Sequence, residues 1–223
     1  MKIGLMVNGL RVEAHYHDDE IENVHKPLLQ RLANVHSANA RRRTVVFLSA
    51  PPGTGKSTLT TFWEWLSRQE PSLPAIQTLP MDGFHHYNDW LDTHHLRAYK
   101  GAPETFDVEK LAQNLRQIRE GEGTWPQYDR QKHDPVEDAI VVSAPIVIVE
   151  GNWLLRDDER WRALAAFCDF SLCQRRPCVR DWWGASWLED YRQPMPRRFT
   201  NAQTDRMLSE CCARVVLPVC YWR

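Results

Sequence analysis

Short hydrophobic runs bounded by turn residues recur along the chain and predict strands. Three of these runs are mostly apolar: Thr44–Ala50, Ala75–Met81 and Pro145–Gly151. Apolar character at consecutive positions is typical of strands that are buried on both faces, as in a parallel sheet. The run Cys168–Leu172 is shorter and predicts the start of a fourth strand.

The segments between these strands have helical character. Helices are predicted over Ser57–Gln69, Val108–Arg119 and Asp157–Phe167, and Asp107 is well placed to cap the second of them. Strands that alternate with helices form βαβ units, which place helices on both faces of a mostly parallel sheet. The chain is therefore predicted to be an α/β protein with three layers.

The first 43 residues have a different pattern. Residues 2–16 alternate between apolar and polar positions around Asn8-Gly9, a dipeptide that favours a tight β-hairpin turn. A helix over Asp19–His36 is predicted to follow, with Pro27 as the site of a kink. The basic run Arg41–Arg43 is interpreted as a solvated loop.

Composition narrows the class of protein. The net charge of -1 over 223 residues gives no reason to expect a nucleic-acid or membrane partner. No apolar run reaches the roughly 18 residues of a membrane helix, and the N-terminus lacks the features of a secretory signal. Five of the six cysteines fall in the last 51 residues, which argues against a disulfide framework. We expect a cytoplasmic protein.

The segment APPGTGKST, Ala50 to Thr58, lies between a predicted strand and a predicted helix. Glycines at 53 and 55 let the backbone approach phosphate oxygens closely, so that backbone N–H groups and the helix N-terminus face the anion. Lys56 has the reach for the terminal phosphates, and the Ser57 hydroxyl suits Mg²⁺. The predicted nucleotide-binding residues are Pro52, Gly53, Thr54, Gly55, Lys56, Ser57 and Thr58.

Two carboxylates end apolar strands and are predicted to lie near this loop. Asp82 follows the second strand and Glu150 lies in the third. Ligands of open parallel sheets bind beyond the carboxyl ends of the strands, so both residues are expected on the rim of the loop. Phosphoryl transfer needs a cation at the phosphates and a carboxylate that accepts the proton of the acceptor hydroxyl. The alternative is that Asp82 starts a turn and Glu150 caps a loop.

A third segment, WPQYDRQKHDP (Trp125 to Pro135), is dense in polar and aromatic residues. We interpret it as a loop that holds a polar substrate, although such loops are often plain surface turns. Tyr128, Arg130 and His133 are its candidate substrate-binding residues.

Five segments in order, APPGTGKST, MDGFHHYN, KGAPETFD, PQYDRQKHDP and VIVEGNWLL, resemble the P-loop kinases that include pantothenate kinase, uridine kinase and phosphoribulokinase. Within that group the likeness extends to the YggC-type kinase-like proteins of enteric bacteria. The resemblance covers about residues 1–172. It implies use of ATP and Mg²⁺, with Asp82 as general base; Lys56, from its place in the glycine-rich loop, is the second candidate catalytic residue. It also implies Glu150 as the acidic residue near the metal, and Tyr128, Arg130 and His133 facing the acceptor.

The likeness stops after Leu172. The last 51 residues hold nine arginines, five cysteines and four tryptophans, with no lysine and no isoleucine. The family would have a helix and a mobile lid here. One permitted reading of Asp181–Leu208 in a shifted frame resembles that lid, so we hypothesise a frameshift near Leu172–Cys178; the alternative is a divergent tail. We divide the chain into residues 1–40 (hairpin and helix), 41–172 (P-loop kinase core) and 173–223 (irregular tail).

The sequence therefore predicts an ATP-dependent kinase that phosphorylates a hydroxyl of a small metabolite. A nucleoside, a pantothenate-like compound and a sugar all remain open as acceptors. The first alternative is an ATP-binding regulator or disabled kinase with little or no transferase activity. The second is an ATPase that drives a conformational change. The oligomeric state is left open, and a homodimer is one possibility.

Overall fold

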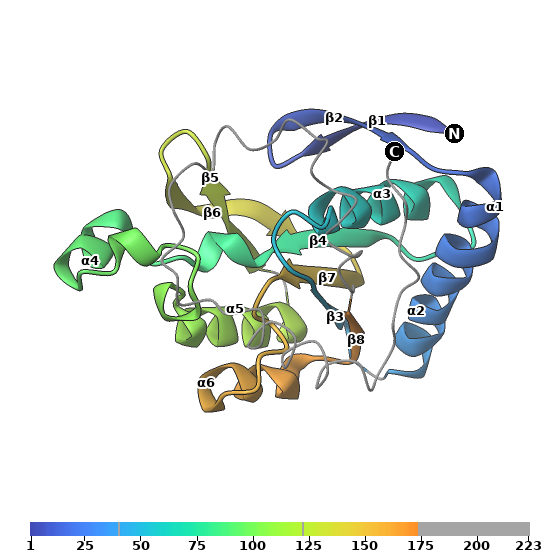
Figure 1. Cartoon of the computed structure of the whole chain (residues 1–223). Helices are drawn as coiled ribbons and strands as arrows, with labels where there is room; N and C mark the ends of the chain where they lie inside the picture. Colours follow the sequence, from blue (N-terminus) through green and yellow to red (C-terminus); the bar gives the residue numbers. More distant parts are fainter. Residues whose placement is uncertain (40, 122, 174–223) are drawn as a thin grey trace.

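The computed structural model describes residues 1–39, 41–121 and 123–173 and places a four-stranded parallel sheet at its centre (Figure 1). The strands lie in the order β4-β7-β3-β8. Their bounds are Thr44–Ser49 for β3, Ile76–Pro80 for β4, Ile146–Gly151 for β7 and Phe170–Cys173 for β8. The four strands predicted from hydrophobic runs are thus confirmed, with ends shifted by one or two residues.

Helices cover both faces of this sheet, as Figure 1 shows. One face carries α2 (Lys26–Ala38) and α3 (Lys56–Gln69), and the other carries α5 (Val108–Glu120) and α6 (Glu159–Arg162). A 3-10 turn over Ala163–Phe167 continues α6. The backbone N–H of Lys110 donates to the Asp107 carboxylate at 2.9 Å, so the predicted cap is present. The three-layer α/β prediction is confirmed.

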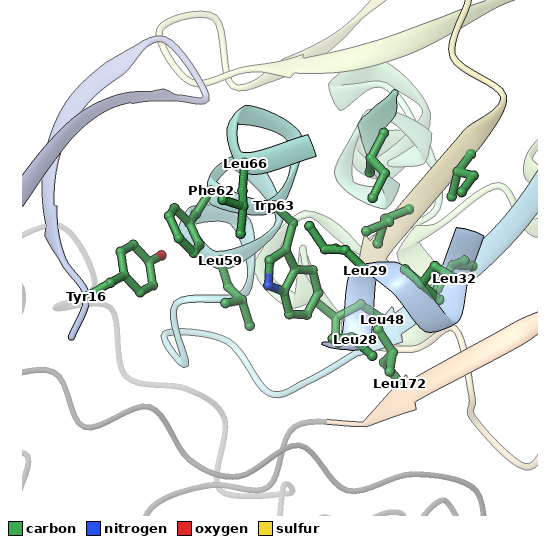
Figure 2. Packing of buried hydrophobic residues seen from close by; sticks show 14 of the residues in the cluster. Tyr16, Leu28, Leu29, Leu32, Leu48, Leu59, Phe62, Trp63, Leu66 and Leu172 are labelled. Carbon is green, nitrogen blue, oxygen red and sulfur yellow. The ribbon is translucent and has the colours of Figure 1, made fainter. Parts of the chain in front are cut away.

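Strand β3 shows why the sheet has two cores. Val46 and Leu48 point into a cluster with α2 and α3, whereas Val45 and Phe47 point into a cluster with α5, and all four are fully buried. Figure 2 shows the first cluster, with Leu59, Phe62, Trp63 and Leu66 of α3 against Leu28, Leu29 and Leu32 of α2. Full burial of each such side chain contributes about 1.5–3 kcal/mol. This packing fixes both ends of the β3–α3 connection.

The N-terminal hairpin consists of β1 (Lys2–Val7) and β2 (Leu10–His15). Asn8 and Gly9 have φ angles of 49° and 81°, the left-handed values that a two-residue hairpin turn requires. The predicted hairpin is therefore confirmed. Leu5 and Ala14 join the cluster around α3, so the hairpin packs on the core. The domain boundary at residue 40 stays a prediction.

The predicted first helix has a break close to the expected proline. It consists of α1 (Asp18–Glu20), a π-helical turn over Ile21–His25, and α2. Pro27 lies in the first turn of α2. Proline has no N–H and its ring collides with the carbonyl four residues earlier, so the wider π turn falls just before it.

The segment Trp125–Pro135 forms a β-hairpin, so its interpretation as a loop was wrong, whereas its role in holding a substrate stays a prediction. Strands β5 (Gly123–Asp129) and β6 (Asp134–Val142) pair antiparallel as a separate two-stranded sheet. Trp125 is fully buried and its indole N–H donates to the Pro80 carbonyl at 2.9 Å. The segment therefore anchors its strands in the core and leaves only residues 130–133 as a turn.

The interpretation of Arg41–Arg43 as a solvated loop is wrong at Arg43, which is 2% exposed. Its guanidinium donates to the carbonyls of Ala144 (2.8 Å), Val142 (3.2 Å) and Gly121 (2.6 Å), and also to that of Ile118. Burial of the charge is tolerated because carbonyl oxygens at the end of α5 and after β6 surround it.

The remaining described elements lie between β4 and α5 in the sequence. They are a 3-10 turn over Met81–Phe84, the short α4 (Asn88–Thr93), and 3-10 turns over Arg97–Tyr99 and Pro103–Thr105. Among the described residues, no helix is long and apolar enough to cross a membrane. Apart from Cys173, the predicted tail and its frameshift hypothesis lie outside the described residues.

Candidate active site

The loop between β3 and α3 has the backbone that its sequence predicts. Gly53 and Gly55 have φ angles of 74° and 80°, which side-chain-bearing residues rarely adopt. Thr54 is buried, and its hydroxyl donates to the Pro51 carbonyl at 2.9 Å, which closes the loop on itself. Helix α3 starts at Lys56, so the free N–H groups of its first turn face the loop. This arrangement suits an anion such as a phosphate chain.

Lys56, Ser57 and Glu150 converge at the start of α3. The Ser57 hydroxyl donates to Glu150 Oε1 at 2.7 Å, and Lys56 Nζ lies 3.9 Å from Glu150 Oε2. The Lys56 ammonium also donates to the Asn152 side-chain oxygen at 2.6 Å. Two oxygens of the hard type that Mg²⁺ prefers, one hydroxyl and one carboxylate, are therefore adjacent. This donor set fits Mg²⁺.

The Glu150 carboxylate is a buried charge, only 3% exposed. Burial raises the pKa of Glu150, and the negative charge of Asp82 adds to the rise. The Lys56 ammonium, the Ser57 hydroxyl and the positive charge of Arg130 oppose it. Here a buried carboxylate with a raised pKa lies among both positive and negative side chains. Such a carboxylate is typical of functional sites, including those that bind cations.

Asp82 lies beside Glu150 on the rim of the sheet. Pro80 pairs with Glu150 across β4 and β7, and Asp82 follows two residues later in the 3-10 turn. A Cβ on Gly83 would lie 2.1 Å from the Pro126 carbonyl oxygen, so only glycine lets the turn approach β5 this closely. Within the described part of the chain, the hydrogen bonds of Asp82 involve its backbone, and its carboxylate makes none.

His85 joins the Asp82 turn to Tyr128. Its Nδ1 lies 2.8 Å from the Asp82 carbonyl oxygen, and because a carbonyl only accepts, Nδ1 carries the proton. The His85 ring centroid lies 4.0 Å from that of Phe106 and 5.2 Å from that of Tyr128. Burial lowers the pKa of His85, which favours the neutral imidazole. In the sequence, His85 and His86 suggest at most a metal site, which is disfavoured because adjacent histidines in a loop seldom point at one ion and no Cys or His partner has suitable spacing.

The three predicted substrate residues lie at the tip of the β5–β6 hairpin. Tyr128 is half-buried at the end of β5, and Lys100 Nζ lies 5.0 Å from its ring centroid. Arg130 is exposed, yet its charge acts on Glu150. The His133 side chain is exposed, and its carbonyl oxygen accepts from Lys100 Nζ at 2.5 Å. The structure thus brings Tyr128 to the Asp82 turn through His85, and it gives His133 a backbone contact only.

Known proteins share this sequence and fold. The chain is 72% identical over 177 residues to the uncharacterised protein YggC of Escherichia coli, covering 79% of this chain and 75% of that protein. It is 30% identical over 182 residues to a pantothenate kinase of Bacillus velezensis, covering 69% of this chain and 57% of the kinase. No family model matches the chain.

Among solved structures, a candidate fructose transport system kinase from a Silicibacter species is 34% identical, with a TM-score of 0.63. The match covers 69% of this chain and 75% of that protein. The fold and these relatives define a P-loop kinase. The chain belongs to the group that includes YggC, pantothenate kinase and uridine kinase, as its sequence motifs predicted. It spans only 55–57% of the length of the matched uridine and pantothenate kinases.

Proposed function

We propose that this protein is an ATP-dependent kinase that transfers the γ-phosphoryl group to a hydroxyl of a small metabolite. The observation that carries the proposal is the 2.7 Å contact between Ser57 and Glu150, made at the start of a helix that follows a glycine-rich loop. Beside it, Asp82 lies in the turn that follows the neighbouring strand β4, and among the described residues its carboxylate makes no hydrogen bond. In this proposal, the same rim of the sheet combines a loop that binds phosphates, two oxygens of the kind that bind Mg²⁺, and a carboxylate that acts as the base.

Each group has a distinct role in this proposal. Residues Pro52 to Thr58 surround the phosphates, with Lys56 on the terminal ones, and Ser57 and Glu150 hold Mg²⁺. When bound, Mg²⁺ neutralises charge that develops on the phosphates. Asp82 accepts the proton of the acceptor hydroxyl as that oxygen attacks phosphorus, an effect worth roughly 10²–10⁴-fold in rate. Tyr128, Arg130 and His133 orient the acceptor.

Lys56→Ala is the decisive variant for this proposal. ADP release is measured with MgATP and a panel of nucleosides, pantothenate and free sugars. We expect an acceptor-stimulated rate in the wild type and a loss of at least about 100-fold in Lys56→Ala, because the ammonium that stabilises the transferred charge is gone. Lys2→Ala, an exposed change on the hairpin, serves as the control and should keep the wild-type rate.

The second candidate function is an ATP-binding protein with little or no transferase activity. It is favoured by the tail, where the sequence departs from the family at the position of the expected lid. MgATP binding without acceptor-stimulated ADP release would support this candidate and contradict the first. Sequencing the DNA from the codon of Phe167 onward tests the frameshift hypothesis, because a one-base insertion or deletion would separate two readable frames.

A further inference from the structure

Asn152 lies at the proposed nucleotide site but has no role in the account above. It follows Glu150 by two residues, just after β7 ends. Its backbone carbonyl oxygen accepts a hydrogen bond of 3.2 Å from the hydroxyl of Ser49, which is the last residue of β3. Its side-chain oxygen accepts from the Lys56 ammonium at 2.6 Å. Asn152 is thus fixed to the strand that precedes the loop and holds the lysine that follows it.

The orientation of the Asn152 amide follows from its partner. A lysine ammonium has three N–H donors and no acceptor, so the atom that faces it must be the amide oxygen. The Lys56 side chain is 11% exposed, and a carboxylate oxygen near it, Glu150 Oε2, lies farther away at 3.9 Å. The short contact to Asn152 therefore determines where the ammonium lies relative to the loop.

The Asn152 side chain carries no charge, and this affects how firmly it holds the Lys56 ammonium. The hydrogen bond from the ammonium to a neutral amide is weaker than the charge-assisted bond that the same ammonium forms with a phosphate oxygen. A carboxylate at the same 2.6 Å would instead compete with the phosphate for the lysine. The amide keeps Lys56 ordered and still lets it turn to an incoming anion.

We propose that Asn152 is a positioning residue for nucleotide binding, which acts by holding the Lys56 ammonium in place for the terminal phosphate of ATP. The inference rests on the proposed function, because it assumes that Lys56 binds that phosphate. It assigns a role to a residue that touches neither metal ligand. Since the effect passes through Lys56, removing Asn152 matters only while Lys56 is present.

A double-mutant cycle tests this dependence. Dissociation constants of MgATP and MgADP are measured by calorimetry for the wild type, Asn152→Ala, Lys56→Ala and the double variant. We expect Asn152→Ala to weaken MgATP binding about 5–20-fold and MgADP binding less, which lowers the preference for the triphosphate. In the Lys56→Ala background, the same change should alter either constant less than about twofold.

Two further variants make the result specific. Asn152→Asp has nearly the same shape, and it should weaken MgATP binding more than Asn152→Ala because its carboxylate pairs with Lys56 and repels phosphate. This variant also keeps the test valid if the alanine variant does not fold. Asn34→Ala, an exposed change on α2, is the matched control and should bind both nucleotides like the wild type.

The outcomes separate the two proposals. Suppose that the wild type binds MgATP and that Asn152→Ala either leaves the dissociation constants unchanged or changes them equally with and without Lys56. Either result overturns the role of Asn152 and leaves the kinase proposal intact. Absence of MgATP binding to the wild type overturns the kinase proposal, and the role of Asn152 with it. An effect that disappears in the Lys56→Ala background supports the inference.

Discussion

Glu150 illustrates how a single residue couples stability to function. The carboxylate is held in a buried position where ionisation is unfavourable, since burial raises its pKa more than Lys56 and Ser57 lower it. Such a group costs folding free energy whenever it is ionised. A buried carboxylate is retained here, in our proposal, because a cation needs its oxygens.

Glu150→Gln should therefore stabilise the protein and abolish Mg²⁺-dependent turnover. The ordinary glutamate pKa is 4.5 and the folded value lies higher, so the folded state binds this proton more tightly than the unfolded chain. The penalty is absent below the ordinary value, grows as pH rises, and is complete above the folded value. We expect a gain on the order of 1 kcal/mol at pH 7.5, or about 2–4 °C in Tm.

Thermal unfolding followed by circular dichroism at pH 7.5 and pH 4.5 checks this expectation. The two proteins should differ at the higher pH and converge at the lower one. A wild type that is more stable than Glu150→Gln at pH 7.5 would contradict it, because the pairing with Lys56 and Ser57 would then outweigh the burial of the charge.

At the scale of elements, the proposed acceptor side of the site is made by two segments that lie far apart in sequence. Lys100 joins them: its ammonium donates to the Asn88 side-chain oxygen at 2.6 Å and to the His133 carbonyl at 2.5 Å. The backbone N–H of Asn88 also donates to the Asp134 carboxylate at 2.9 Å. The start of α4 is thereby attached to the β5–β6 turn.

Lys100→Met keeps the length of the side chain and removes these bonds. We expect a loss of stability of about 1–3 kcal/mol, because the carbonyl of His133 and the amide of Asn88 lose a charged donor. The KM for the acceptor should rise about 5–20-fold and the KM for ATP should stay within twofold, since Tyr128 lies under this ammonium and the phosphate loop does not.

Steady-state kinetics with the acceptor that gives the highest rate measures this split between the two KM values. Lys2→Met, on the N-terminal hairpin, is the matched control and should change neither. An equal rise in both KM values would show that Lys100 supports the fold in general and that it has no specific effect on the acceptor side.

The sequence was informative where hydrophobic pattern and backbone geometry coincide. The strands β3, β4 and β7 are nearly continuous apolar runs, and Asn8-Gly9 and the two loop glycines need φ angles that few other residues adopt. These features are local, so the fold class and the phosphate loop followed from the sequence. The position of Asp82 and Glu150 at one rim of the sheet followed from the rule that ligands of parallel sheets bind beyond the strand ends, and their roles stay predictions.

The sequence was uninformative where a contact joins distant residues. Strands β5 and β6 lack a clean alternation, because the register shifts between Trp125 and Gln127 and most of β6 is exposed. Arg43 looks like part of a basic loop, and the carbonyls that make its burial favourable belong to residues 75 or more positions away. The contact of Asn152 with Lys56 spans 96 positions and belongs to no local pattern.

At the scale of the whole molecule, the N-terminal segment supports the helix that begins at the phosphate loop. Tyr16 follows β2 and stacks on Phe62 of α3 with a centroid distance of 3.6 Å. The π turn places His25, 1% exposed, between the hairpin and α3, where Trp63 Nε1 donates to its Nδ1 at 3.0 Å. Figure 2 shows Tyr16, Phe62 and Trp63 in this cluster. The hairpin, the π turn and α3 thus share one packed aromatic core.

This core should make the stability of the protein depend on pH through His25. Burial lowers the pKa of His25 below its ordinary 6.5, and Glu20, 3.4 Å from Nε2, opposes this. The folded state therefore prefers the neutral ring, which accepts the Trp63 N–H. The resulting stability is complete above pH 6.5 and is lost as pH falls through the lower folded pKa.

His25→Gln separates titration from hydrogen bonding, because glutamine offers Trp63 an acceptor that does not titrate. Urea unfolding at pH 7.5 and pH 5 should show that the wild type loses about 1 kcal/mol more than this variant over the interval. His94→Gln, an exposed change on the α4 side, should keep the wild-type slope, which separates His25 from histidines in general. If the wild type and His25→Gln lose equal stability between pH 7.5 and pH 5, the aromatic core tolerates the protonated His25 ring. The pH dependence would then come from other groups, with half-buried His85 the first to test.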